Sequence, residues 1–195
     1  MNEGLKYQRN AIHATPRDKN DIFATMLKSD THALRALEPT DSEFLYELEN
    51  ASEEWWLGAT ISPLGLETLK QFAGGQHDLY RDLQLRLMIT TADGTTVGTV
   101  DLYQYEPRNR RAGVGIAILN RHRKQGHARA GLALMYDYAF QHLGLHQLWA
   151  EIPASNAETV QLFQAVGFEQ SGHLKDWIWR APHWEDAVLV QALMN

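Results

Sequence analysis

The spacing of apolar and polar residues predicts a succession of short strands and helices. Between residues 83 and 89 every second residue is leucine or isoleucine and the residues between them are mostly polar, which is the period of a half-buried strand. A polar turn at residues 92–95 separates this segment from a second apolar stretch at residues 96–105. We therefore expect an antiparallel hairpin over residues 83–105.

The other elements follow from the same periodicities and from capping residues. Further strands are expected at residues 32–38, 111–118, 147–152, 168–180 and 186–193. Helices are expected after the capping-box sequence Thr40-Asp41-Ser42-Glu43, after Pro63 and up to Gly74-Gly75, over about residues 126–143, and from Ser155 or Asn156 to Val166.

This order of elements predicts an α+β domain built on one mixed sheet of about six or seven strands with about four helices. The strand at residues 111–118, the long helix and the strand at residues 147–152 form a crossover, which makes these strands a parallel pair within a mostly antiparallel sheet. We assign residues 31–195 to this single domain and residues 1–30 to an N-terminal arm. Ligands bind readily outside the ends of parallel strands, so the crossover is the expected place for a site.

Composition narrows the class of protein. The chain has 195 residues, of which 44% are hydrophobic and 22% charged, as in an average folded domain. It has no cysteine, which excludes disulfides, thiolate metal sites and a cysteine nucleophile. A net charge of −6 argues against nucleic-acid binding, and no run of about 18 apolar residues is present to cross a membrane. Because a signal-peptide pattern is absent, we expect a cytoplasmic protein.

The basic loop RKQGHA at residues 123–128, just before the long helix, is the most informative local sequence. A helix start presents unpaired backbone N–H groups and the positive end of the helix dipole, so it attracts anions. The glycine and the alanine let a diphosphate approach the backbone, and the neighbouring basic side chains favour a polyanion. An ordinary glycine-containing helix entry with a solvated basic face is the alternative. The loop has neither a Walker motif nor the dinucleotide fingerprint GxGxxG.

The strand before this loop carries two glycines, Gly113 and Gly115, among apolar residues. Glycine inside an apolar strand marks a bulge or the close approach of a ligand. We therefore expect an extended ligand arm to lie beside this strand, with its anionic end at the loop.

Loop and strand together resemble the GNAT superfamily of acetyl-CoA-dependent N-acetyltransferases. The loop matches the superfamily signature Arg/Gln-x-x-Gly-x-Gly/Ala through Arg123, Gly126 and Ala128. The stretch NAETVQLFQAVGFEQSG at residues 156–172 is similar to the second half of that fold, where an asparagine opens a helix and Gly-Phe begins the last strand pair. The similarity points to the branch that holds ribosomal-protein N-terminal acetyltransferases and polyamine (spermidine) N-acetyltransferases.

The resemblance implies a coenzyme site of three parts. In the superfamily the loop amides bind the diphosphate of acetyl-CoA, the preceding strand pairs with the pantetheine arm, and an asparagine lies near the coenzyme. Carried over to this chain, the coenzyme-binding residues are Ile116, Ala117, Ile118, Arg123, Lys124, Gln125, Gly126, His127, Ala128, Asn156 and Phe163. Asn156 is also suited to cap its helix, and the two roles are compatible.

Phe163 departs from the resemblance. The superfamily frequently has a tyrosine at this position that protonates the leaving thiolate, whereas phenylalanine has no proton to donate. Either another group donates it, or the thiolate leaves unassisted, or catalysis is lost. Taken by itself, Phe163 is best explained as a core aromatic beside Val160.

Similar polyamine acetyltransferases carry a catalytic carboxylate on the strand before the loop-bearing strand. Asp101 occupies that place as a base, and Glu106 is the second candidate. A surface or hairpin charge is the alternative for Asp101. Other candidates for the acceptor site are also explained by a solvated helix face or by hairpin packing: Glu47, Glu49, Glu53, Glu54, Trp177, Trp179 and Trp184.

The expected activity is transfer of an acetyl group from acetyl-CoA to a primary amine by direct attack on the thioester. The acceptor is left open between a protein N-terminus, a polyamine and another small amine. No metal is expected, because the sequence lacks HExxH, and the GxSxG elbow of serine hydrolases is absent too. A non-catalytic acetyl-CoA-binding or regulatory module is the alternative function, and the question of a homo-oligomer stays open.

Overall fold

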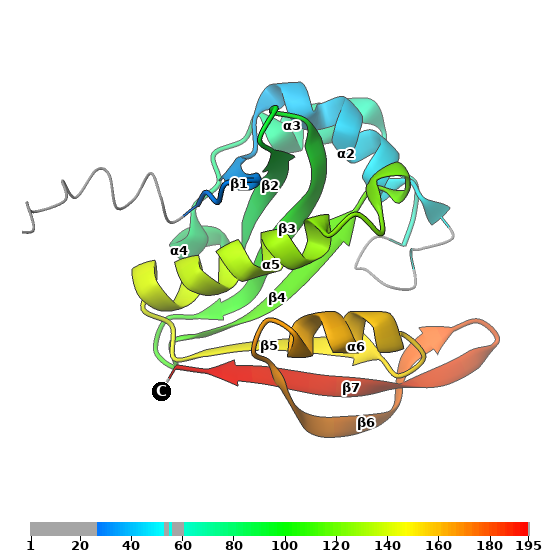
Figure 1. Cartoon of the computed structure of the whole chain (residues 1–195). Helices are drawn as coiled ribbons and strands as arrows, with labels where there is room; N and C mark the ends of the chain where they lie inside the picture. The colour runs from blue at the N-terminus through cyan, green and yellow to red at the C-terminus, as the bar shows by residue number, and fades with distance from the viewer. Residues whose placement is uncertain (1–26, 53–54, 56–60, 195) are drawn as a thin grey trace, which may run out of the picture.

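A computed structural model describes residues 27–52, 55 and 61–194, in which seven strands form one sheet in the order β1-β2-β3-β4-β5-β7-β6 (Figure 1). All neighbouring strands are antiparallel except β4 and β5, so the predicted mixed sheet and its parallel pair are confirmed. The strands are β1 (His32–Ala36), β2 (Leu85–Thr91), β3 (Thr96–Glu106), β4 (Arg111–Ile118), β5 (Gln147–Pro153), β6 (Glu169–Arg180) and β7 (His183–Leu193).

Helices cover both faces of the sheet. One face carries α5 over β1 to β4 and α6 over β6 and β7, and the opposite face carries α2 and α3 (Figure 1). None of the helices among the described residues is both long and apolar enough to cross a membrane. The helices are α2 (Ser42–Glu49), α3 (Leu66–Ala73), α4 (Leu79–Asp82), α5 (His127–Asp137), which continues as a π-helical turn at Tyr138–His142, and α6 (Ala157–Gln164).

The alternation of side chains along β2 explains why both faces are covered. Leu87 and Ile89 join the main core under α5, whereas Met88 between them packs with Leu45 of α2 and Leu69 of α3 on the other face. Successive side chains of a strand point to opposite faces, so an uninterrupted apolar stretch needs helices on both sides. The central strands are therefore buried from two directions.

The parallel pair separates soon after it begins. β4 and β5 pair only at Arg111–Gln147, Ala112–Leu148 and Gly113–Trp149. Beyond that point the two strands diverge toward their C-terminal ends, and α5 begins beside the wide end (Figure 1). The backbone of β4 after Gly113 is consequently open on the side that faces β5.

The start of α2 differs from the predicted capping box. A 3-10 turn at Pro39–Asp41 precedes the helix, and Asp41 accepts a hydrogen bond from the backbone N–H of Glu38 at 2.9 Å. Arg35 of β1 holds both oxygens of the same carboxylate at 2.7 Å. The capping residues are therefore Glu38 and Asp41, because Arg35 holds the Asp41 carboxylate in place. Thr40 is not the capping residue.

The start of β2 also differs. Leu83 has the alternating spacing of the strand, but it lies outside β2 in the left-handed conformation, with a φ of 52°. It follows α4, a four-residue helix capped by Asp78, whose side chain accepts from the N–H of Arg81 at 2.8 Å. A helix of one turn is too short to produce a periodic pattern, so the spacing of apolar residues does not predict it.

Candidate active site

The loop between β4 and α5 presents an open helix N-terminus. Gly126 caps α5 with a φ of 85°, a conformation that favours glycine, and nothing lies within 4 Å of the place where its Cβ would stand. The Nε of Arg123 donates to the carbonyl of Ile118 at 2.9 Å, which ties the loop to the end of β4. Residues 123–128 therefore lie at the wide end of the divergence, and no side chain caps the first backbone N–H groups of α5, which have no partner within the helix and suit an anion.

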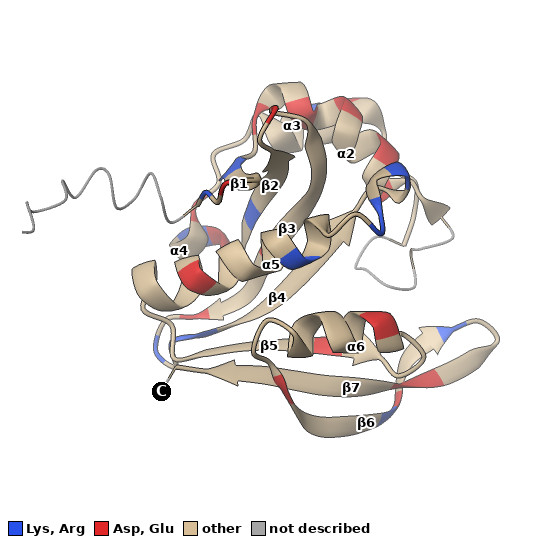
Figure 2. Ribbon diagram, in the orientation of Figure 1, with Lys and Arg blue, Asp and Glu red and all other residues tan. Residues whose placement is uncertain are grey.

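Basic residues of this loop lie next to acidic residues of α2 (Figure 2). Arg121 forms an ion pair with Glu47 of α2, and both side chains are 53% exposed. Gln125 donates from its side-chain amide to the carbonyl of Arg121 at 3.3 Å. The pair of Arg121 with Glu47 lowers the net positive charge of the loop and links it to the helix on the other face.

His127 takes part in a contact that the sequence does not reveal. Its Nδ1 lies 2.7 Å from the Nε2 of His32 on β1, and the Nδ1 of His32 lies 2.8 Å from the hydroxyl of Thr31. Burial lowers the pKa of His32, and the proximity of His127 lowers it further. The ring of His127 therefore points to β1, and its backbone N–H remains part of the helix start.

Asn156 stands on the other side of the divergence, just after β5. Its side-chain oxygen accepts from the N–H of Thr159 at 3.2 Å, so the helix-capping role considered from the sequence is confirmed. Together with Ser155, Glu158 and Arg180 it lines a shallow hollow. Parallel strands end at the same edge of a sheet, so Asn156 and the basic loop face the same opening from its two sides.

Phe163 is a core residue. Its side chain is 2% exposed, and its ring packs edge-on against Phe168 with 4.9 Å between centroids. The interpretation of Phe163 as a core aromatic is therefore confirmed, and α6 offers no hydroxyl at this place. It belongs to the main core between α5, α6 and the sheet, together with Val160.

A group of polar side chains occupies the opposite face, where β4 and β5 begin to separate. Arg86 donates to both oxygens of Asp101 at 2.8 and 3.1 Å and to Glu49 of α2 at 2.6 Å. The register pairs Arg86 with Asp101, Asp101 with Gly115 and Tyr103 with Gly113, which puts all of these on the face that carries α2. We call Arg86, Asp101, Tyr103, Trp149 and Glu151 the polar cluster.

Burial and charge act against each other at Asp101. Burial raises the pKa of its carboxyl group, and the adjacent guanidinium of Arg86 offsets this only in part. In turn, Asp101 and Glu49 raise the pKa of Arg86 in spite of its burial. The arginine is therefore a permanent cation shared by two carboxylates, and the group as a whole carries an excess of negative charge.

The sequence did not single out Tyr103, Trp149 or Glu151. The rings of Tyr103 and Trp149 meet edge-on at 5.3 Å across the end of the parallel pair. Glu151, two residues further along β5, accepts a hydrogen bond from the indole of Trp177 at 2.8 Å. These contacts depend on which strands are neighbours and in what register, and no local pattern encodes that.

The three tryptophans considered for the acceptor site lie in two different places. Trp177 is bound to Glu151 and thus borders the polar cluster, although it is 50% exposed. Trp179 and Trp184 are register partners near the tip of the β6–β7 hairpin, and their rings contact each other at 5.2 Å. Of the acidic residues named with them, Glu53 and Glu54 lie outside the described residues, as does most of the predicted N-terminal arm.

Glu106 lies at the other end of β3. Its carboxylate accepts from Arg111 at 2.7 and 2.9 Å and from Asn109 at 2.6 Å, close to the turn into β4. Its partner Arg111 lies four positions before Gly115, the partner of Asp101, along β4, which is about 13 Å of strand. The structure therefore brings Asp101 to the polar cluster and leaves Glu106 outside it. Among the described residues, no group of three or more potential metal ligands comes together.

Comparison with known proteins identifies the family. The model of the acetyltransferase (GNAT) domain matches residues 32–169. The spermidine N(1)-acetyltransferase of Vibrio cholerae is 28% identical over 143 residues, which cover 72% of this chain and 80% of that protein. The putative ribosomal N-acetyltransferase YdaF of Bacillus subtilis is 25% identical over 150 residues, which cover 75% and 82%.

A solved structure shows the same fold. The crystal structure of the spermidine N-acetyltransferase of Vibrio cholerae in complex with CoA and spermine superposes with a TM-score of 0.73, at 24% sequence identity, over 85% of this chain and 96% of that one. The family model spans well over half of the chain, and the matched proteins are N-acetyltransferases by name. The chain therefore belongs to the GNAT acetyltransferase family and is an acyl-CoA-dependent N-acetyltransferase.

Proposed function

We propose that this protein transfers the acetyl group of acetyl-CoA to a primary amine of a polycationic acceptor of the polyamine class. The observation that carries the proposal is the charge of the polar cluster and its surroundings. Arg86 is paired with Glu49 and Asp101 where β4 and β5 separate, and a third carboxylate, that of Glu151, lies near Tyr103, so three carboxylates stand against one guanidinium in this group. Excess negative charge beside aromatic rings favours a cationic ligand.

For the coenzyme, we assign the diphosphate to the backbone N–H groups of residues 123–128. The pantetheine arm then lies along residues 116–118 of β4, with Asn156 on the far side of the opening. Two observations support this assignment: Gly126 leaves open space at the N-terminus of α5, and β4 has lost its pairing with β5 beyond Gly113. A relative of the same fold has been crystallised with CoA.

The acceptor amine approaches from the face of the sheet that carries α2. Glu151 attracts the ammonium group, because it is exposed and no cation is bonded to it among the described residues. Asp101 acts as the base, directly or through a water molecule, and its raised pKa suits a group that must accept a proton. The neutral amine then attacks the thioester carbon, and a backbone N–H of β4 polarises the carbonyl oxygen.

The relatives support this choice of acceptor. The Vibrio cholerae relative is a spermidine N(1)-acetyltransferase, and the solved structure of similar fold holds spermine. A ribosomal-protein acceptor, as the name of the Bacillus subtilis relative suggests, gains less from the polar cluster than a polyamine does, because its N-terminal amino group is a single cation. A cytoplasmic location remains a prediction from the sequence, and the question of a homo-oligomer stays open.

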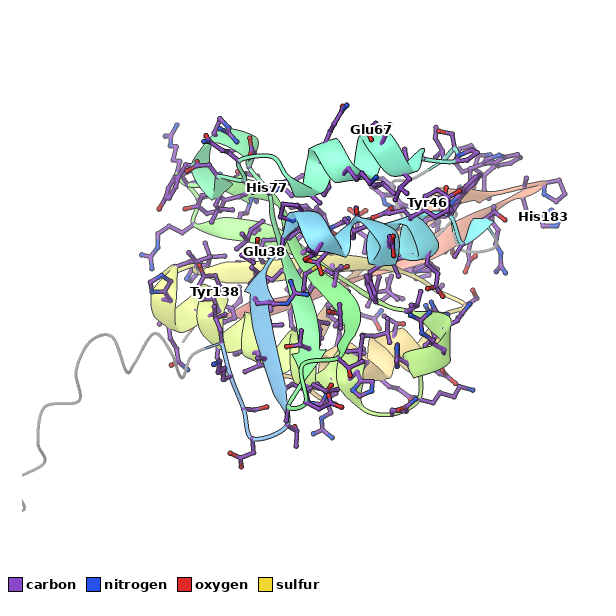
Figure 3. The ribbon with its side chains drawn as sticks, turned by 90° about the horizontal axis from the view of Figure 1, so that it is seen from above. Glu38, Tyr46, Glu67, His77, Tyr138 and His183 are labelled. Atoms are coloured by element: carbon purple, nitrogen blue, oxygen red, sulfur yellow. The ribbon has the colours of Figure 1, made fainter. Side chains whose placement is uncertain are left out.

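A coenzyme-consumption assay tests the acceptor. We expect spermidine or spermine to be acetylated with a kcat/KM at least about tenfold higher than that of butylamine, which has one cation, because a second charge adds binding energy. Glu151→Gln should raise KM for the polyamine and leave kcat within about twofold, since its role is to attract the cation. Glu67→Gln, an equivalent change on the exposed side of α3, is the matched control (Figure 3). Equal kcat/KM for butylamine and spermidine would refute the proposed acceptor class.

A further inference from the structure

Position 163 of α6 has no hydroxyl for the leaving group. Phe163 is 2% exposed and packed against Phe168, so it neither donates a proton nor contacts solvent. When the carbon–sulfur bond of the thioester breaks, the sulfur acquires a negative charge. Any hydrogen-bond donor for that charge must therefore come from another part of the opening.

Tyr103 reaches across β4 on the opposite face. A Cβ added to Gly113 would lie 2.3 Å from the Cε2 of this ring and 2.5 Å from its Cζ, which carries the hydroxyl. A Cβ at Gly115 would lie 3.7 Å from Cε1, an ordinary contact. Gly113 is thus the residue that makes room for the ring, and the hydroxyl-bearing end of Tyr103 lies over the last paired residue of β4.

The position of this hydroxyl coincides with the point where the strands part. Gly113 and Trp149 are the last partners of β4 and β5, and the ring of Tyr103 contacts Trp149 edge-on at 5.3 Å. An arm that runs along β4 from the basic loop toward the narrow end of the opening must stop there, because the strands are joined beyond it. The thioester at the end of that arm then lies beside Tyr103.

The hydroxyl of Tyr103 is available to a ligand. It makes no hydrogen bond to any of the residues that the structure describes. Burial, together with the nearby charges of Glu151 and Asp101, raises the pKa of Tyr103 to about 12. The group is accordingly neutral at every pH at which the protein works, and it remains a donor while a thiol with a pKa near 8.5 ionises.

We propose that Tyr103 donates a hydrogen bond to the sulfur of the coenzyme and stabilises the thiolate as it leaves, in place of a hydroxyl at position 163. This rests on the proposed function, because it takes the coenzyme to lie along β4. The lone pair of the amine forms the carbon–nitrogen bond, and the electron pair of the carbon–sulfur bond passes to sulfur. The ammonium acceptor loses two protons in all, one before attack and one after it, and the thiolate regains one from water.

Titration of bound CoA tests the contact directly and needs no acceptor. The thiolate absorbs in the ultraviolet, and the complex with desulfo-CoA serves as the blank. We expect the pKa of the bound thiol to be about one unit higher in Tyr103→Phe than in the parent, because a hydrogen bond to a charged group is worth about one pKa unit or more. Tyr138→Phe, another tyrosine whose pKa burial raises, is the matched control at the far end of α5 (Figure 3).

Kinetics supply the second readout. Tyr103→Phe should lower kcat by about 10- to 100-fold and leave the Kd for CoA within about twofold, since the hydroxyl acts on the leaving group. The variant should fold, because the hydroxyl it removes has no partner among the described residues. Equal thiol pKa values in parent and Tyr103→Phe, or an unchanged kcat, would overturn the role of Tyr103 alone. If the parent failed to bind CoA, the coenzyme assignment would fall as well.

Discussion

Arg86 of β2 donates to both carboxylate oxygens of Asp101 on β3, at 2.8 and 3.1 Å. A third hydrogen bond from the same guanidinium, at 2.6 Å, reaches Glu49 near the end of α2. The arginine thus joins the sheet to the helix that covers it, and the ring of Phe72 on α3 lies 5.8 Å from the guanidinium carbon. One side chain therefore fixes the position of the candidate base and of two helices.

Replacement of Arg86 by methionine should strongly destabilise the fold. The side chains of Arg86, Asp101 and Glu49 are only 15% to 18% exposed. Without the guanidinium, the carboxylates of Asp101 and Glu49 would be left largely buried with no cation beside them. Breaking such a pair by removing one partner costs about 3–5 kcal/mol. Urea unfolding at neutral pH measures the loss. Arg81→Met, which breaks a solvent-exposed pair with Asp82, should leave the midpoint unchanged; an equal effect of the two changes would contradict this account.

Two carboxylates on β3 compete for the role of base, and turnover distinguishes them. Asp101→Asn should lower kcat by about 10²–10⁴-fold and spare CoA binding, because the amide cannot accept the proton of the ammonium group. Glu106→Gln should keep kcat within about twofold, since its carboxylate is bound to Arg111 at the other end of the strand. The measurement is steady-state acetylation of the best acceptor. If the two changes exchanged their effects, Glu106 would be the base.

The elements around the loop could be predicted more closely than the contacts of the site. The sequence identified β4 with its bounds, the helix start at Gly126 and the capping role of Asn156, because each depends on a few neighbouring residues. The sequence alone does not point to Tyr103 and Glu151, because their positions in the site depend on the pairing of β3 with β4 and of β4 with β5. The resemblance to polyamine acetyltransferases points to the carboxylate of Asp101, but its bond to Arg86 depends on the register of β2 and β3, which no local pattern encodes.

Gly126→Glu should abolish CoA binding. The open space around Gly126 accommodates a side chain, so steric bulk is not the cause; the added negative charge at the helix N-terminus repels the diphosphate. The φ of 85° also strains any residue other than glycine. Gly94→Glu is the matched control, because Gly94 has a φ of 87° and equally open surroundings in the turn between β2 and β3. Calorimetry with CoA should detect binding to the Gly94 variant only, and binding to both would refute the loop assignment.

The contact between His32 and His127 predicts a loss of stability in mild acid. The pKa of His32 lies below its usual value of about 6.5, because burial and His127 disfavour the charged form. As the pH falls below about 6.5, the unfolded chain takes up a proton that the folded chain resists, so the free energy of unfolding decreases. His32→Gln should therefore lose less stability than the parent between about pH 7.5 and pH 5.5. Urea titrations at those two pH values measure the free energy of unfolding.

His183→Gln is the control for this pH dependence. His183 is exposed at the start of β7, far from β1 (Figure 3). The change should leave the pH dependence of unfolding as it is in the parent. A His32→Gln variant with the full acid-induced loss would show that the histidine contact does not contribute to it.

The last prediction concerns the hydroxyl that is absent at position 163 of α6. Phe163→Tyr would place that hydroxyl in a core position that is 2% exposed, where an unsatisfied hydroxyl costs about 1–3 kcal/mol of stability. If Tyr103 already stabilises the leaving sulfur, a second donor adds little, and kcat should rise by less than about 100-fold, the low end of acid–base contributions.

The gain should be larger when Phe163→Tyr is combined with Tyr103→Phe than when it is made in the parent, because the two hydroxyls would serve the same atom. Steady-state turnover of the four proteins measures this coupling. Equal gains in both backgrounds would show that the two positions act independently, and Tyr103 would then have no part in the departure of the thiolate.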